Sequence, residues 1–202
     1  LQKPIDEERQ RLSAGGHTRA WFDDFKTLSQ VRDYCDLLAT TYPAFVTRRT
    51  VGHALEGREI FSLEFTDPAR TPGKPALLVI ATQHAREWIA VSSIMYVADS
   101  LARGYGVDSA VTSLLDSFDV YLVPVANPDG YEYTWTNDRY WRKNKRVVFD
   151  KVYGVDINRN AGYMWGLGGS SSSASSEVYR GTAPFSEPES TTIHDYALSI
   201  PN

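Results

Sequence analysis

The sequence predicts an α/β fold, with a mixed, mainly parallel sheet sandwiched between helices. Two apolar runs, "ALLVIA" within residues 74–82 and "VYLVPV" within residues 117–130, are typical of buried strands. Residues 29–43 and 87–106 carry apolar side chains at helical spacing and alternate with those runs. Strands that alternate with helices favour a sheet with helices on both of its faces.

The other segments fit this architecture. Residues 45–67 alternate in polarity on either side of a Gly-containing turn and predict a β-hairpin. Because the run in 74–82 is continuously apolar, we expect that strand to be covered on both faces. Residues 166–177, "GLGGSSSSASSE", predict a loop. A further helix should begin at "SEPES", where Ser186 and Glu189 fit a capping box.

Length and composition predict one domain. The chain has 202 residues, of which 42% are hydrophobic, which suits a single domain with a substantial core. Residues 1–20 are polar and charged without an apolar period, so we interpret them as a leader or connecting segment. The domain itself is expected to extend over residues 21–202.

Charge and hydropathy argue against two classes of partner. The formal net charge is −4, and phosphate binding needs a clustered basic surface, so no nucleic-acid partner is expected. No apolar stretch approaches the roughly 20 residues that span a bilayer, so no membrane partner is expected. Cys35 is the single cysteine, which excludes an internal disulfide.

A histidine and a glutamate follow the first buried strand. In open α/β sheets the functional crevice lies beyond the carboxyl ends of strands, where His84 is expected. Glu87 is three residues later, in the first turn of the next helix, so both side chains can reach one point. They would form two-thirds of a His₂Glu zinc site. The alternative is a surface histidine beside a glutamate that complements the helix dipole, because this pattern alone is weak.

Further clusters occur in a specific order along the chain. After "QHAREW" (83–88) come "NPDGYEYTWTNDRYWRKNKR" (127–146), "GVDINRN" (154–160) and "SEVYRGTAPFSEPES" (176–190). This order resembles the zinc metallocarboxypeptidases of the carboxypeptidase A/B type, with the C-terminal part missing. The resemblance extends from Trp21 to the end of the chain.

The resemblance implies a metal centre and a group that stabilises negative charge. His84 and Glu87 correspond to two ligands of one Zn²⁺ ion. Asp156 corresponds to the carboxylate that accepts the other N–H of the first histidine and so fixes its tautomer. Arg142 corresponds to the arginine that stabilises the oxyanion during attack on the scissile carbonyl.

The resemblance also implies substrate contacts. Asn158 and Arg159 correspond to the pair that binds the terminal carboxylate of a peptide, and Arg86 to a residue of the outer subsites. A guanidinium suits a bidentate carboxylate contact. For Arg139 we favour a solvated or ion-paired surface group.

Some expected family features are missing. The third ligand of the family is a histidine on a strand that follows the helix beginning in "SEPES". His194 lies inside that helix, so we expect it to be a surface or packing residue. The tyrosine that closes over substrate, the water-activating glutamate and the side-chain-selecting residue are also missing. Val152 and Ser175 occupy positions where many relatives have a disulfide. Residues 21–202 are therefore expected to be the N-terminal part of a catalytic domain, and 1–20 a leader or propeptide-derived segment.

The implied function is zinc-dependent hydrolysis of the C-terminal peptide bond of peptides and proteins. The implied partner is a substrate with a free C-terminal carboxylate, and we expect a secreted or extracellular monomer. This 202-residue chain alone is expected to be inactive. The alternative is a non-catalytic peptide-binding relative or an inactive fragment.

Overall fold

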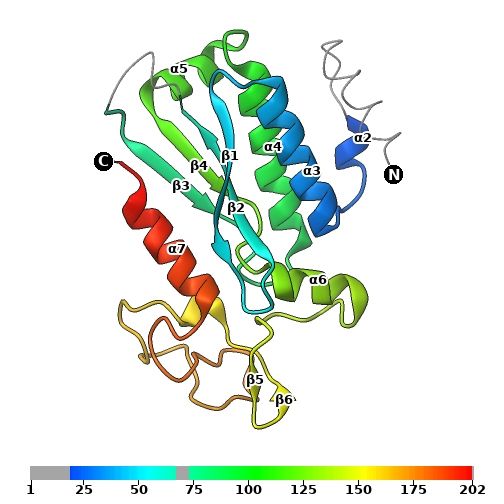
Figure 1. The fold of residues 1–202 in the computed structure, drawn as a ribbon, viewed down its shortest axis with the longest axis vertical. Helices are drawn as coiled ribbons and strands as arrows, with labels where there is room; N and C mark the ends of the chain where they lie inside the picture. The colour runs from blue at the N-terminus through cyan, green and yellow to red at the C-terminus, as the bar shows by residue number, and fades with distance from the viewer. Residues whose placement is uncertain (1–18, 67–72, 202) are drawn as a thin grey trace.

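A computed structural model describes residues 19–66 and 73–201 of the chain (Figure 1). The segment 1–20, interpreted as a leader, lies almost entirely outside the described residues. The elements are α2 Arg19–Phe22, α3 Leu28–Thr41, β1 Val46–His53, β2 Glu59–Phe65, β3 Ala76–Ile80, α4 Trp88–Gly104, α5 Ser109–Ser117, β4 Asp119–Val123, α6 Pro128–Thr136, β5 Val147–Val148, β6 Lys151–Val152, the 3₁₀ turn Ile157–Arg159 and α7 Pro188–Ser199.

A four-stranded sheet in the order β1-β2-β4-β3 forms the centre of the fold. β1 and β2 form the predicted antiparallel hairpin, β2 pairs antiparallel with β4, and β4 pairs parallel with β3. The sheet is mixed, as predicted, but the expectation that it is mainly parallel is wrong for the described strands. Parallel pairing needs a long crossover, and among these strands the connection from β3 to β4, with α4 and α5, provides one.

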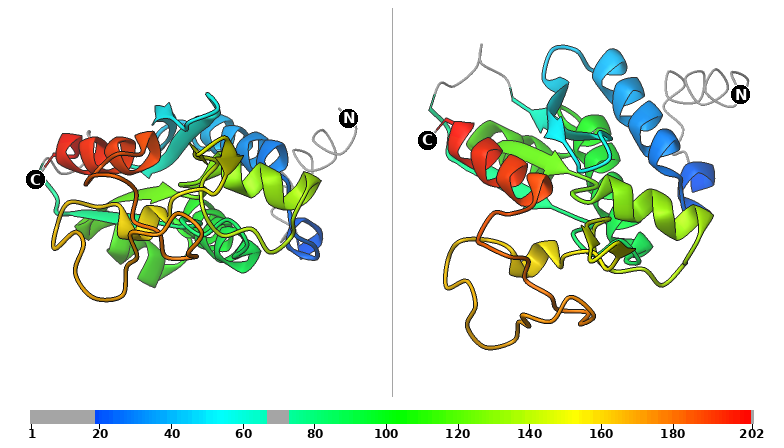
Figure 2. Two further views of the ribbon diagram at one scale, coloured as in Figure 1. Left: turned by 90° about the horizontal axis from the view of Figure 1, so that it is seen from below. Right: turned by 60° about the horizontal axis from the view of Figure 1, so that its bottom comes forward.

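Helices cover both faces of the sheet, as predicted (Figure 2). On one face α3, α4 and α5 pack on a core that contains Leu63 and Leu122. On the other face α7 contributes Tyr196 to a second core with Tyr121 and Val123 of β4. Successive side chains point to opposite faces of a strand, so adjacent residues of β4 enter different cores.

The first long helix has the pattern that its sequence predicts. Thr27 caps α3 in a capping box with Gln30, and the helix buries Val31, Cys35 and Leu38 at helical spacing. No helix within residues 19–66 or 73–201 is long and apolar enough to cross a bilayer.

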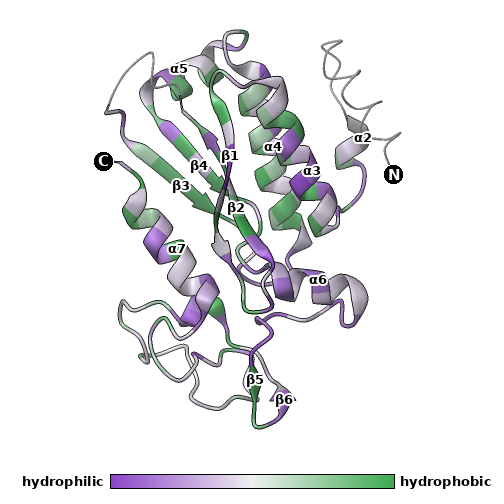
Figure 3. Ribbon diagram, viewed as in Figure 1, coloured by the Kyte–Doolittle hydropathy of each residue, from purple (hydrophilic) through white to green (hydrophobic). Residues whose placement is uncertain are grey.

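β3 is buried less than predicted. Leu77 and Val79 are 43% and 38% exposed, although Figure 3 shows that the strand is hydrophobic. Among the described strands β3 pairs with β4 alone, so it lies at an edge of the sheet. An edge strand lacks the second neighbour that would help to cover its side chains, and the expected cover on both faces is therefore wrong here.

The predicted capping box at the start of α7 does not form. The N-cap of α7 is Glu187, which makes no side-chain cap hydrogen bond. Glu189 instead accepts hydrogen bonds from the Leu55 backbone N–H and the Asn144 side chain. Glu189, which the local spacing predicts as a capping residue, therefore binds partners that are distant in sequence.

Candidate functional site

His84 and Glu87 converge in the turn between β3 and α4. His84 follows the end of the strand by four residues, and Glu87 is the N-cap residue of α4 but makes no side-chain cap hydrogen bond. The Nδ1 atom of His84 lies 2.8 Å from the Oε1 atom of Glu87. The Glu87 side chain is 49% exposed, whereas that of His84 is 13% exposed. An imidazole nitrogen and a carboxylate oxygen thus face one point that is open to solvent.

Asp156 approaches the other side of the same imidazole. Its Oδ1 atom lies 3.3 Å from His84 Nε2, although the geometry is not that of a hydrogen bond. Asp156 is fully buried. Burial alone would raise the pKa of Asp156, but contacts with His84 and Arg142 and the charge of Arg142 hold this pKa below its usual value. The carboxylate therefore stays ionised against the imidazole ring.

Arg142 shares Asp156 with His84. Its Nη2 and Nε atoms lie 2.9 and 3.3 Å from Asp156 Oδ2. The Arg142 carbonyl accepts a hydrogen bond of 2.9 Å from the N–H of Ala85, the residue after His84. The structure therefore brings His84, Glu87, Arg142 and Asp156 together.

The other three predicted site residues are distributed around this centre. The exposed Asn158 lines a cleft of about 480 Å³ together with His84 and Glu87. Arg159 donates to the carbonyls of Gly169 and Asn158 at 2.9 Å, so its guanidinium meets the Ser-rich loop. Arg86 donates to the Tyr140 carbonyl and lies 3.3 Å from Glu177. Of these three residues, Asn158 lines the cleft beside His84 and Glu87, and both arginines contact loop residues.

Two basic residues next to the site are held by structural contacts. Arg139 stacks on Trp88, with 3.7 Å from its guanidinium carbon to the ring centre, and donates to the Arg86 carbonyl. Arg139 was expected to be solvated or ion-paired at the surface, and the structure instead shows it stacked on an aromatic ring. Lys143 is buried and donates to the carbonyls of Ala174 and Ser176. Burial lowers the pKa of Lys143.

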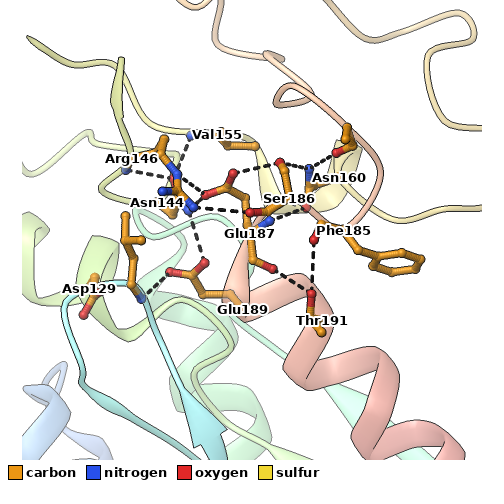
Figure 4. A network of polar contacts seen from close by, with 12 residues as sticks. Asp129, Asn144, Arg146, Val155, Asn160, Phe185, Ser186, Glu187, Glu189 and Thr191 are labelled. Atoms are coloured by element: carbon orange, nitrogen blue, oxygen red, sulfur yellow. Dashed lines mark hydrogen bonds and ion pairs between the residues drawn. The ribbon is translucent and has the colours of Figure 1, made fainter. Parts of the chain in front are cut away.

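Sequence reasoning missed a buried polar network next to these residues. Asn144 contacts both Glu187 and Glu189 at the start of α7, and Asn160 contacts Ser186 (Figure 4). A possible signal was the pair of acids in "SEPES", which local spacing explained as a helix cap. Asn144 is more than 40 positions away from both acids along the chain, so no local pattern reveals the contact.

The donor set can be compared with the requirements of a metal ion. Nitrogen from His84 and oxygen from Glu87 are the ligand types that zinc accepts. In residues 19–66 and 73–201 no group of three or more His, Cys, Asp or Glu side chains could hold a metal ion. These residues therefore fit two positions of a zinc site. His194 is an exposed residue of α7 whose ring centre lies 4.6 Å from that of Phe185, as expected for a surface or packing residue.

Both the sequence and the fold are similar to those of known proteins. A family model described as zinc carboxypeptidase matches residues 31–201. Carboxypeptidase A1 of Rattus norvegicus is 35% identical over 208 residues, which cover 100% of this chain and 49% of that protein. An inactive metallocarboxypeptidase of Ajellomyces dermatitidis is 38% identical over 200 residues, which cover 95% of this chain and 34% of that protein. The chain therefore spans less than half the length of these relatives.

Solved structures agree with these matches. Carboxypeptidase A from Helicoverpa armigera superposes with a TM-score of 0.79 at 34% identity, over 97% of this chain and 49% of that one. A crystal structure of thrombin-activatable fibrinolysis inhibitor gives a TM-score of 0.82 at 33% identity, over 90% and 47% of the two chains. With a family match over most of its length and the same fold, the chain belongs to the zinc carboxypeptidase family.

Proposed function

We propose that this chain is the N-terminal part of the catalytic domain of a metallocarboxypeptidase that uses one zinc ion to hydrolyse the C-terminal peptide bond of peptides and proteins. One observation carries the proposal, namely the His84 imidazole between two carboxylates. Nδ1 lies 2.8 Å from Glu87, and Nε2 lies 3.3 Å from Asp156. Histidines that bind metals are commonly oriented by a carboxylate at their second nitrogen.

His84 and Glu87 would hold the ion, with a third ligand from outside the described residues. Bound zinc supplies a Lewis acid that polarises a peptide carbonyl and lowers the pKa of water. If His84 offers Nδ1 to the ion, its proton would be on Nε2, which faces the Asp156 carboxylate 3.3 Å away. The buried carboxylate would thus favour the tautomer that binds metal.

Arg142 is the proposed source of positive charge for the reaction. Its guanidinium is held 2.9 Å from Asp156, beside His84, so it needs little reorganisation to face a developing oxyanion. Preorganised donors of this kind typically contribute about 10²–10³ in kcat. Asn158 and Arg159 would bind the terminal carboxylate of the substrate, and Arg86 would line an outer subsite. These roles make the activity that of an exopeptidase.

The remaining proposals concern the whole protein. We expect a secreted or extracellular monomer whose partner is a peptide with a free C-terminal carboxylate. Residues 1–20 would be a leader or propeptide-derived segment that precedes the catalytic domain. The expectation that residues 1–202 alone are inactive rests on residues 19–66 and 73–201, where no group of three candidate ligands could hold the ion.

A second candidate function is peptide binding without catalysis. The observation that favours it is the 38% identity to an inactive metallocarboxypeptidase. In that case the cleft beside His84 would hold a peptide end without hydrolysis. Release of C-terminal amino acids separates the two functions directly.

The metal assignment is tested by metal analysis of the protein as its source expresses it. The wild type should contain one zinc per chain, and His84→Ala should lose it, because a ligand is removed. His194→Ala is the matched control and should keep its zinc, since His194 packs on Phe185 within α7. Stoichiometric zinc in His84→Ala would contradict the assignment.

The exopeptidase assignment is tested with pairs of peptides that differ only at the C-terminus. Free carboxylates should be cleaved and amides should not. Arg159→Ala should mainly raise KM, because its contact forms in the ground state, whereas Arg142→Ala should mainly lower kcat. Equal cleavage of amidated and free peptides would exclude this assignment.

A further inference from the structure

Asn144 lies two residues after Arg142 and is completely buried. Its side-chain nitrogen donates to Glu187 Oε2 at 2.7 Å and to Glu189 Oε2 at 3.1 Å (Figure 4). Both acids are at the start of α7 and are also buried. The segment that carries Arg142 is therefore attached to a helix that packs on the sheet.

The oxygen of the same side chain holds the segment that carries Asp156. Asn144 Oδ1 accepts hydrogen bonds from the Val155 N–H at 2.7 Å and from the Arg146 N–H at 3.1 Å. The backbone N–H of Asn144 donates to the Val155 carbonyl at 3.0 Å. Asp156 is the next residue along the chain, so the hydrogen bonds of Asn144 fix the backbone position from which the Asp156 side chain extends.

These bonds determine how the candidate residues face one another. Arg142 and Asp156 belong to these two paired segments, and Arg142 Nη2 lies 2.9 Å from Asp156 Oδ2. The Arg142 carbonyl also receives the Ala85 N–H at 2.9 Å, directly after His84. Movement of the Asn144 segment would therefore shift the guanidinium, the carboxylate and the turn that carries the imidazole.

The position requires a side chain that both donates and accepts. The nitrogen faces two carboxylates and the oxygen faces two backbone N–H groups, so an amide satisfies every partner. Arg146 Nε lies 3.0 Å from Glu187 Oε2 and balances its charge. Buried networks whose members are all satisfied are rigid. An alanine or a carboxylate at this position would leave partners unsatisfied.

We propose that Asn144 is a positioning residue, which holds Arg142 and Asp156 in register with each other and with His84. The inference rests on the proposed function for the role of Arg142, but the geometric part does not depend on activity. Asn144 itself needs no contact with substrate.

The kinetic test uses Asn144→Ala and Arg142→Ala, singly and together, in the protein as its source expresses it. Asn144→Ala should lower kcat by roughly 10- to 100-fold with a smaller change in KM, since small displacements of catalytic groups have effects of this size. In the Arg142→Ala background the same change should have little further effect, because the group that it positions is gone. Equal effects of Asn144→Ala in both backgrounds would overturn the proposal.

The structural test is hydrogen exchange, which needs no catalytic activity. Asn144→Ala should speed exchange at the Ala85 and Asn158 amides, whose acceptors are the Arg142 carbonyl and Asp156 Oδ1. Tyr196→Phe is the matched control, because it removes a buried hydrogen bond from α7 to Glu64. Unchanged exchange at Ala85 and Asn158, or the same change in the control, would refute positioning even if the protein proves inactive.

A third variant covers the case in which Asn144→Ala does not fold. Asn144→Asp keeps the shape and the Oδ1 acceptor but places a carboxylate against Glu187 and Glu189, and should speed exchange at Ala85. Adding Glu187→Gln returns the cluster to its original net charge. The double variant should recover part of the protection of the Ala85 amide from exchange. Full protection in Asn144→Asp, or no recovery in the double variant, would contradict the proposed donor role.

Discussion

The two halves of the candidate site are built in different ways. His84 and Glu87 belong to one turn, are three positions apart and include a half-exposed carboxylate. Arg142 and Asp156 come from separate loops, and their carboxylate is fully buried. The first half pairs two neighbours within one turn, whereas the second is held by buried hydrogen bonds that reach α7. Damage to the loops should therefore cost much more stability than damage to the turn.

Removal of Asp156 should have the largest effect. Asp156→Ala leaves Arg142 without its buried partner, and breaking such a pair costs about 3–5 kcal/mol of unfolding free energy. Glu87→Ala, in the exposed half, should change stability by less than about 1 kcal/mol. Urea unfolding of both variants measures the difference. Similar losses would show that the two halves are equally supported.

The next effect concerns Gly154, which is adjacent to Val155. Its φ is +68°, and an added Cβ would lie 2.4 Å from the Asn144 carbonyl oxygen. Gly154→Ala should therefore lose about 3 kcal/mol, from both conformation and overlap. Gly57 has φ of +83° with nothing within 4 Å, so Gly57→Ala should lose about 1 kcal/mol from conformation alone. Thermal unfolding measures the stability of both variants. Equal losses would mean that the overlap with the Asn144 carbonyl oxygen costs no stability.

A smaller effect is confined to acid pH. Burial and the charge of Glu187 raise the pKa of Glu189, despite hydrogen bonds from Asn144 and Leu55. This carboxyl therefore lowers stability as pH rises from the unfolded pKa, about 4.3, through the folded pKa. Relative to Glu189→Gln, the wild type should gain stability as pH falls toward about 4 and gain no more below it. Parallel urea midpoints over this range would contradict the raised pKa.

The smallest effect is expected at the surface. Glu177 lies 3.3 Å from Arg86, and their side chains are 64% and 37% exposed. Glu177→Ala should change the unfolding free energy by about 0–1 kcal/mol, and added salt should remove the difference. A salt-independent loss of several kcal/mol would show that this loop contact is part of the buried half.

Local patterns predicted the elements that carry the site. The hairpin, the helix at Leu28–Thr41, the strand before His84 and the helix after Glu87 all follow from apolar spacing and turn residues. The same patterns failed where a partner is distant. β3 is an edge strand, and Glu189 binds Asn144 rather than capping α7.

By itself, the sequence determined that an imidazole and a carboxylate three residues apart follow a strand, because chain geometry places such neighbours together. The tertiary structure alone decided that Arg142 faces Asp156 and that Asn144 connects their segments to α7. Those contacts join residues 14 and 43 positions apart. Such contacts form only when folding excludes water from polar groups that must then find partners in the protein, and no local spacing specifies which partners those will be.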